Sequence, residues 1–528
     1  MSPSSTRGAG PELIRQWIER AAQRHPDKPY IVSVEDDRVL TYAGLHGLVA
    51  RLATVLHRRW IGANDRVALF ANNSIEHVVC YVGVMSYGAT VCTVHVEMNR
   101  RHLGRIVGAL RPRLMLYDDG VAADELTPQG TSPDGFTSRH LALGRFDRPE
   151  PGTLFAALND AGDAGAPPFS AATERDDGVI FYTSGTTARP KGVVLTYREQ
   201  IGNVEPMADA FGIDEDDRIY DYRSFNWASA QLLGILAPLA RGATLVMARK
   251  FSASRFFDDV RRHAVTVAAG NPTIINMLLS TDTALTTADV PSLRFLTSSS
   301  APLLPQEWQR FEERFGIPVA QGYGSSETAW IAANPGRERR FGTVGKPLAY
   351  HRLAIVDPAG QSLPQGEIGE VEIGAWNDNE YRYLDDEGTV RVNSRGRMRT
   401  GDIGFLDRDG FLHLTGREKD IIIRGGVNIS PIEIDGVLMQ HADVAEAATV
   451  GVPDQVWGEE VVSYVVPRPG ARLAVDDVLR FCTAQLPAFK APKQIVLLAA
   501  LPKSERGKLD RRALVAQWSR EQALATPK

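Results

Sequence analysis

The sequence predicts an α/β protein: a large N-terminal domain of two layered α/β subdomains and a small barrel-like β subdomain, then a small α+β C-terminal domain. The chain has 528 residues, which is more than one hydrophobic core usually supports. Short apolar runs alternate with segments of helical length over much of the chain. After Gly416 a stretch of about 110 residues has the size of an independent domain. We therefore expect domains at residues 1–416 and 417–528.

The first α/β subdomain is expected over residues 13–94, where periodic apolar segments alternate with short strand-like runs such as Val67–Phe70. Residues 118–177 follow, with many Gly, Pro, Ala and acidic side chains. That composition is typical of a loosely structured surface crossing. We therefore expect little regular structure there.

The second α/β subdomain is expected over residues 197–319. A helix is predicted at 253–263, and strands at 244–248 and 293–297. From residue 353 to 414 the strands become short and turn signals separate them. This pattern predicts the small antiparallel β subdomain.

The composition favours small-molecule partners. With 43% hydrophobic residues, 23% charged residues and a net charge of -5, the chain offers no basic field for nucleic acid or anionic lipid. It has no signal-like leader and no apolar run of about 20 residues, so we expect a cytoplasmic protein without a membrane span. Cys80, Cys92 and Cys482 form no C-x-x-C pair, which suits a reduced compartment. The oligomeric state is left open, with a homodimer as one candidate.

A hydroxyl-rich loop at Phe181–Gly192 is the clearest chemical signal in the chain. It combines short hydroxyl donors, a glycine that permits close approach and a cation: Thr183, Ser184, Gly185, Thr186, Thr187 and Lys191. The order of residues does not fit the P-loop or the dinucleotide-binding fingerprint. A plain surface turn is the alternative for such a cluster. We interpret the loop as a site for the phosphates of ATP.

Five further segments occur in a fixed order with this loop: Ser298–Leu303, Gln321–Thr328, Arg399–Asp402, Gly416–Asn428 and Pro502–Arg511. Together they resemble the adenylate-forming superfamily of AMP-binding enzymes, which includes the acyl- and aryl-CoA synthetases. The resemblance runs from about Pro11 to Trp518. It implies a mobile C-terminal domain and an ATP- and Mg²⁺-dependent carboxylate:CoA ligase, which forms an acyl-adenylate, releases pyrophosphate and makes an acyl-CoA thioester.

Two other functions are kept as alternatives. A stand-alone adenylating enzyme would pass the acyl-adenylate to a carrier-protein thiol, supplied in trans, or to a nitrogen nucleophile instead of coenzyme A. A non-catalytic regulator would bind the nucleotide and use the domain swing as a signal. Pyrophosphate exchange that depends on a carboxylic acid distinguishes an enzyme from a regulator.

The resemblance also implies roles for single residues. Lys508 is expected to bridge the substrate carboxylate and the α-phosphate, with Thr187 as a further catalytic residue, and Glu327 to hold Mg²⁺. The remaining nucleotide contacts are expected from Ser300, Ala301, Pro302, Gly322, Tyr323 and Ser326 around the adenine, and from Asp402 and Arg417 at the ribose or phosphates. Lys419 falls at the hinge of the C-terminal domain, and Gly425 and Gly426 beside a pantetheine channel, although the two glycines also suit a tight turn.

The acyl pocket is predicted from residues around the second α/β subdomain: Asn226, Trp227, Gln231, Ser299, Gly324 and Trp330. The two tryptophans suit packing against helices equally well. Asn226 stands where many relatives have His, and residues 376–397 lack the Gly-Tyr-Trp motif of the family. Arg223 could pair with a second substrate carboxylate, but we expect it at the surface. We predict a small to medium acid that is partly polar or aromatic.

Overall fold

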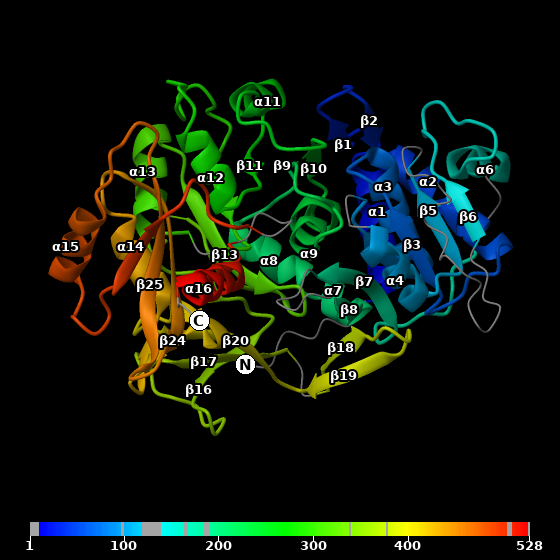
Figure 1. Cartoon of the computed structure of the whole chain (residues 1–528). Coiled ribbons are helices and arrows are strands. Elements are labelled where there is room, and N and C mark those ends of the chain that lie inside the picture. Colours follow the sequence, from blue (N-terminus) through cyan, green and yellow to red (C-terminus); the bar gives the residue numbers. More distant parts are fainter. Residues whose placement is uncertain are drawn as a thin grey trace.

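The computed structural model describes residues 10–96, 100–118, 139–162, 167–183, 191–301, 303–336, 339–375, 378–503 and 509–525. In Figure 1 the blue N-terminal elements lie on the right, the green elements in the centre and on the left, and the orange and red C-terminal elements on the left. The described strands form four sheets of eight, nine, four and five strands. The predicted fold class is confirmed.

The first sheet has the strand order β19-β18-β8-β7-β4-β3-β5-β6. Strands β7, β4, β3, β5 and β6 pair in parallel, and the apolar β3 is buried at four of its five positions. The strands are β3 (Arg66–Phe70), β4 (Thr90–Val94), β5 (Leu114–Tyr117), β6 (Arg139–Ala142), β7 (Asp177–Thr183), β8 (Lys191–Thr196), β18 (Glu380–Leu384) and β19 (Val390–Arg395). The helices of this region are α1 (Pro11–Arg24), α2 (Tyr42–Arg58), α3 (Ile75–Tyr87), α4 (Arg100–Leu110) and α6 (Leu154–Ala161).

The second sheet has the order β15-β14-β13-β12-β11-β9-β10-β1-β2, parallel from β1 to β13. Its strands are β1 (Pro29–Ser33), β2 (Val39–Thr41), β9 (Arg218–Asp221), β10 (Thr244–Met247), β11 (Val267–Ala268), β12 (Phe295–Ser298), β13 (Val319–Ser325), β14 (Ala329–Asn334) and β15 (Lys346–Pro347). The helices are α7 (Tyr197–Ile201), α8 (Val204–Phe211), α9 (Ala228–Ala230), the π-helix η1 (Gln231–Leu236), α10 (Ala237–Arg241), α11 (Phe256–Arg262), α12 (Pro272–Leu279) and α13 (Pro305–Phe315). The predicted helix and both predicted strands are present as α11, β10 and β12.

The third sheet is the small antiparallel β subdomain, with the order β16-β17-β20-β21. It contains β16 (Arg352–Val356), β17 (Gly369–Gly374), β20 (Met398–Leu406) and β21 (Leu412–Arg417). The prediction for residues 353–414 is right for these strands and wrong for β18 and β19. Those two strands leave the subdomain, because β18 pairs with β8 and so extends the first sheet.

The C-terminal module has its own sheet, β23-β22-β25-β24, with β26 beside β25. Its elements are the 3₁₀-helix η2 (Glu418–Asp420), β22 (Ile422–Arg424), β23 (Val427–Ile429), α14 (Pro431–Leu438), β24 (Val444–Asp454), β25 (Gly458–Pro467), α15 (Val475–Gln485), β26 (Gln494–Leu497) and α16 (Arg511–Ala525). Two hydrophobic clusters within residues 422–518 pack on the two faces of this sheet. The boundary at residues 416 and 417 stays a prediction.

The prediction of a loose crossing over residues 118–177 is wrong where the structure describes it. Strand β6 extends the first sheet beside β5, and α6 packs with buried Leu154, Phe155 and Leu158. Thr153 begins this helix by accepting a hydrogen bond from the backbone N–H of Ala156. In the described segments no helix combines the length and the apolar character that crossing a membrane needs.

Candidate functional site

Tyr323 and Asp402 come from different sheets and meet at a direct hydrogen bond. The Tyr323 hydroxyl, on β13, donates to Oδ2 of Asp402, on β20, over 2.6 Å. Nε of Arg417, at the end of β21, lies 2.9 Å from the other carboxylate oxygen. Tyr323 and Asp402 are both buried, and burial, with the nearby Asp402 charge, raises the pKa of the Tyr323 phenol, which therefore stays a donor. The structure thus brings three of the predicted nucleotide residues together.

Glu327 lies in the turn between β13 and β14, and Tyr383 of β18 reaches it from the first sheet. The Tyr383 hydroxyl donates to Oε1 of Glu327 over 2.9 Å. The ammonium of Lys191 lies 5.4 Å from the centroid of the same tyrosine ring. His351 holds the neighbouring turn, because its Nε2 lies 3.0 Å from the carbonyl oxygen of Thr328. Tyr383 is not among the residues that we predicted from the sequence. The one sequence signal for it is the absence of the family motif at residues 376–397.

The loop after β12 carries polar atoms without partners. Ser298 and Ser299 are buried, and their hydroxyls have no hydrogen-bond partner among the described residues. Ser298 lies opposite Gln321 of β13, whose Oε1 is also buried and unpaired there. Ser300 is exposed and has φ of 73°, a strained value for a residue with a side chain. Ala301 and Ser326 are half-buried.

Gly322 is required by the packing of Trp330. A Cβ at Gly322 would lie only 2.1 Å from the Trp330 ring. That ring is 2% exposed and packs edge-on against Phe211, with centroids 5.3 Å apart. Gly324 lies beside Trp330 at an irregularity of the β13–β14 pairing. The described contacts of Trp330 are therefore core contacts, so packing accounts for this tryptophan.

Asn226 follows β9 and is fixed by hydrogen bonds to the first subdomain. Its Nδ2 donates to the carbonyl oxygen of Ala71 over 3.0 Å, which fixes the amide orientation because a carbonyl cannot donate. Its Oδ1 is buried and has no partner among the described residues. Trp227 is only half-buried and stacks on His95, with ring centroids 6.3 Å apart.

Gln231 begins the π-helix η1 and is fully buried. Its Nε2 donates to Thr93 Oγ1 and to the carbonyl oxygen of Phe225, each over 3.0 Å. Its Oε1 accepts hydrogen bonds from Tyr81 at 3.2 Å and from Gln200 at 3.4 Å. Both protons and both acceptor positions of this amide are therefore used within the protein. Gln231 therefore supports Phe225, which directly precedes Asn226, and the sequence did not indicate this network.

Arg223 is not a surface residue, so this expectation is wrong. Its side chain is 3% exposed and forms a two-fold ion pair with Asp221, with Nη2–Oδ2 at 2.6 Å and Nε–Oδ1 at 3.0 Å. The pair lies at the end of β9. A buried guanidinium needs such a partner, and here the neighbouring strand residue supplies it.

The predicted hinge and pantetheine residues lie where the small sheet meets the C-terminal module. Lys419 is exposed in η2, directly between β21 and β22. Gly425 and Gly426 form the two-residue turn between β22 and β23, with φ values of 58° and 83°. A Cβ at Gly425 would lie 2.7 Å from the ring of Trp457, whereas Gly426 has free space around it. The tight-turn interpretation of these glycines is confirmed.

Several predicted residues lie outside the described residues: Ser184, Gly185, Thr186, Thr187, Pro302 and Lys508. Thr183 is the last residue of β7, and Lys191 is the first of β8. The two strands pair in antiparallel fashion and therefore bring the two ends of the predicted phosphate loop together.

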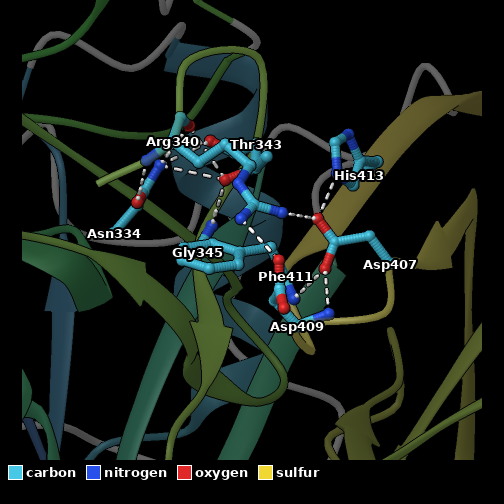
Figure 2. Close-up of polar contacts among 8 residues, drawn as sticks. All are labelled: Asn334, Arg340, Thr343, Gly345, Asp407, Asp409, Phe411 and His413. Carbon is cyan, nitrogen blue, oxygen red and sulfur yellow. Dashed lines mark hydrogen bonds and ion pairs between the residues drawn. The ribbon is translucent and has the colours of Figure 1, made fainter. Parts of the chain in front are cut away.

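A cluster that we call the Arg340 clamp joins the end of β14 to the turn after β20, and Figure 2 shows its residues. Strands β13 and β20 carry Tyr323 and Asp402. Asn334 ends β14, and its amide donates to the carbonyl oxygen of Arg340 over 2.7 Å and accepts from the N–H of Arg340 over 3.0 Å. The Arg340 guanidinium pairs with Asp407 and with Asp409 in the turn after β20. The four residues named here constitute the clamp.

Asp407 is held as a carboxylate by its surroundings. Burial would raise its pKa, but hydrogen bonds from His413, from the backbone of Phe411 and from Arg340 hold the pKa of Asp407 at about 2. Nε2 of His413 lies 3.0 Å from Oδ2 of Asp407. The clamp therefore keeps its negative charge at neutral pH, opposite the positive charge of Arg340.

The chain matches the AMP-binding enzyme family over residues 18–375 and the AMP-binding enzyme C-terminal domain over residues 433–508. It is 33% identical to the oxalate–CoA ligase of Arabidopsis thaliana, covering 96% of this chain and 98% of that protein. It is 33% identical to the sulfoacetate–CoA ligase of Cupriavidus necator, covering 94% and 96%. The crystal structure of ATP-bound MatB from Rhodopseudomonas palustris superposes with a TM-score of 0.82 at 26% identity, covering 96% of this chain and 99% of that chain. This protein therefore belongs to the AMP-binding enzyme family.

Proposed function

We propose that this protein is an ATP-dependent carboxylate:CoA ligase that works through an acyl-adenylate. The observation that carries the proposal is the group formed by Tyr323, Asp402 and Arg417, with Glu327 next to it on the turn after β13. This group occurs in a chain that is similar along almost its whole length to proteins named as CoA ligases. The protein acts on small molecules, and we propose that it does so in the cytoplasm.

In the first half-reaction a carboxylate oxygen of the acid attacks the α-phosphorus of ATP, and the bond to pyrophosphate breaks. Negative charge grows on the α-phosphate and on the leaving group, so fixed cations accelerate the step. We assign this charge to Lys508 and Lys191, and a further catalytic role to Thr187. Asp402 accepts hydrogen bonds from the ribose hydroxyls, and Arg417 contacts the ribose or the phosphates. Tyr323 holds Asp402 and lies against the adenine.

Glu327 suits a divalent cation that is shared with the phosphates. One oxygen of its carboxylate is held by Tyr383, and the other has no partner among the described residues. A hard cation such as Mg²⁺ accepts one protein carboxylate and completes its shell with phosphate and water oxygens. When bound, it neutralises charge on the pyrophosphate as it leaves. In the described part of the chain no group of three or more His, Cys, Asp or Glu residues could hold a metal by protein ligands alone.

In the second half-reaction the thiol sulfur of coenzyme A attacks the acyl carbonyl carbon, and AMP leaves. The C-terminal module turns about Lys419, withdraws Lys508 and brings the turn at Gly425 and Gly426 towards the thiol. The exposed position of Lys419 between two strands of different sheets supports this hinge. The open space around Gly426 leaves room for a pantetheine chain.

The acid is small to medium and carries a polar group. Arg223 is neutralised by Asp221 and so offers no free charge to a second carboxylate. Among the described residues Oδ1 of Asn226 has no hydrogen-bond partner, and we take it as an acceptor that favours an acid with a hydroxyl or N–H donor. Trp227 supplies an aromatic surface next to Asn226 in the chain, and we assign Ser299 and Gly324 to the same pocket.

The test is acid-dependent pyrophosphate release with a panel of short, hydroxylated, aromatic and dicarboxylic acids, with and without coenzyme A, with mass analysis of the products. We expect an acyl-CoA product from hydroxylated short acids. An acyl-adenylate that accumulates despite coenzyme A would indicate a carrier-protein or nitrogen acceptor. If no acid on the panel supports pyrophosphate exchange, the result favours the alternative of a non-catalytic regulator. Lys508→Ala should abolish adenylation and spare thioester formation from a supplied acyl-adenylate.

A further inference from the structure

Tyr383 contacts two groups of the proposed ATP site, although the proposed reaction gives it no role. It lies on β18, within the segment where the sequence departs from the family motif. Strand β18 pairs with β8, with Tyr383 opposite Val193, two residues after Lys191. Tyr383 is therefore carried on the strand next to the one that leaves the predicted phosphate loop.

The hydroxyl of Tyr383 fixes one oxygen of Glu327. The separation of 2.9 Å is that of a direct hydrogen bond to a carboxylate. An ionised carboxylate has no proton to donate, so the phenol is the donor in this bond. Glu327 is left with its second oxygen for another ligand, and the hydrogen bond restrains the rotation of the carboxylate.

The ring of Tyr383 meets the ammonium of Lys191. Nζ lies 5.4 Å from the ring centroid, within the range of a cation–π contact. Strand β18 is anchored independently of these two contacts, because Arg382, the residue before Tyr383, pairs with Asp177 of β7 over 2.6 Å at a largely buried position. One rigidly held side chain thus touches the carboxylate through its hydroxyl and the lysine through its ring.

We propose that Tyr383 is a positioning residue that orients Glu327 for the divalent cation and Lys191 for the phosphates of ATP. The proposal rests on the proposed function, because it takes Glu327 to be the cation ligand. Groups that hold a metal ligand in place affect affinity strongly, with losses of about 10- to 100-fold when they are removed. The ring and the hydroxyl have separate tasks, so two substitutions can distinguish them.

The experiment measures binding, not turnover. Mn²⁺, a hard cation that shares the oxygen preference of Mg²⁺, is titrated into the full-length protein by electron paramagnetic resonance, in the presence of a saturating non-hydrolysable ATP analogue. The affinity for the analogue without metal is measured separately by calorimetry. Tyr383→Phe removes only the hydroxyl, and Tyr383→Leu removes the ring as well. Tyr381→Phe, on the same strand and without contact to Glu327, is the matched control.

We expect Tyr383→Phe to weaken Mn²⁺ binding about tenfold or more, with metal-free analogue binding and Tm unchanged. Tyr383→Leu should weaken both binding events. Normal Mn²⁺ binding by Tyr383→Phe, together with weak binding by Glu327→Gln, overturns the role of Tyr383 and leaves the cation site standing. Normal binding by Glu327→Gln overturns the cation assignment itself. If Tyr383→Phe lowers the Mn²⁺ affinity, the metal-free affinity for the analogue and the Tm together, the tyrosine has a purely structural role and the proposal is overturned.

Discussion

Replacing Asn334 with alanine tests whether the Arg340 clamp holds the two site hairpins together (Figure 2). Asn334 is 2% exposed, so water cannot easily replace its hydrogen bonds. It exchanges two bonds with the main chain of Arg340, at 2.7 and 3.0 Å. It also donates to the hydroxyl of Thr343 at 3.0 Å and to the carbonyl oxygen of Thr343 at 3.2 Å. Alanine would remove all of these bonds.

The size of the effect follows from these partners. A buried neutral hydrogen bond contributes about 1 kcal/mol net, and a buried group left without a partner loses about 1–3 kcal/mol. The carbonyl oxygen of Arg340 keeps a second bond from the Thr343 hydroxyl, at 3.0 Å, which offsets part of the loss. We therefore expect the free energy of unfolding to fall by about 2–3 kcal/mol. For a domain as large as the N-terminal one this corresponds to a Tm lower by roughly 2–4 °C.

The clamp should also affect nucleotide binding, because it joins the strand pair of Tyr323 to the strand pair of Asp402. We expect the ATP affinity of Asn334→Ala, measured by calorimetry, to fall about threefold to tenfold, or roughly 0.7–1.4 kcal/mol. Gln440→Ala is the control, because its exposed amide makes one hydrogen bond of 3.2 Å, to Gly436 in the C-terminal module. An unchanged Tm would refute the hydrogen-bond reasoning. A lower Tm with normal ATP affinity would refute the coupling between clamp and site.

Three further predictions concern the same elements. Tyr323→Phe leaves Oδ2 of buried Asp402 without its donor, although Arg417 still pairs with Oδ1, and should lower the free energy of unfolding in urea by about 1.5–3 kcal/mol; a change below 0.5 kcal/mol would speak against it. The pKa of Asp407 is lowered to about 2, so its ionised carboxylate stabilises the fold above pH 4. This stabilisation is lost as the pH falls towards 2. Asp407→Asn should therefore reduce the loss of unfolding free energy between pH 5 and pH 3 by about 0.5 kcal/mol after allowance for solvent screening, and parallel curves for the two proteins would contradict this. Gly425→Ala forces a side chain into a left-handed turn and against Trp457, so it should lower the Tm and slow thioester formation more than adenylation; equal slowing would count against the pantetheine role.

Local sequence patterns predicted much of the fold. The apolar run at residues 67–70 became β3, and the predicted helix and strands of the second subdomain became α11, β10 and β12. Short-range patterns suffice there, because apolar periodicity and turn residues act within a few positions. The order of motifs also identified Tyr323, Asp402 and Arg417, which the structure brings into contact.

Long-range pairing was not predictable in this way. The strand pattern of β18 is compatible with either sheet, and it pairs with β8, about 190 residues earlier, because tertiary contacts decide between sheets. Arginine is a residue type that is usually found at the surface. Asp221, two positions before Arg223, nevertheless forms an ion pair with its guanidinium inside the protein. Gln231 finds its partners Thr93 and Gln200 only after the two subdomains meet.

The described part of the candidate site depends on how three sheets are placed relative to each other. Tyr323 of the second sheet meets Asp402 of the third, and Glu327, in a turn of the second, meets Tyr383 of the first. Each contact is a hydrogen bond of 2.6–2.9 Å, and such bonds weaken steeply when their geometry is disturbed. A relative shift of two sheets by less than 1 Å would therefore release a carboxylate of the candidate site without changing any residue of the site. Changes at distant sheet contacts such as the Arg340 clamp should consequently act on ATP binding before they unfold the domain.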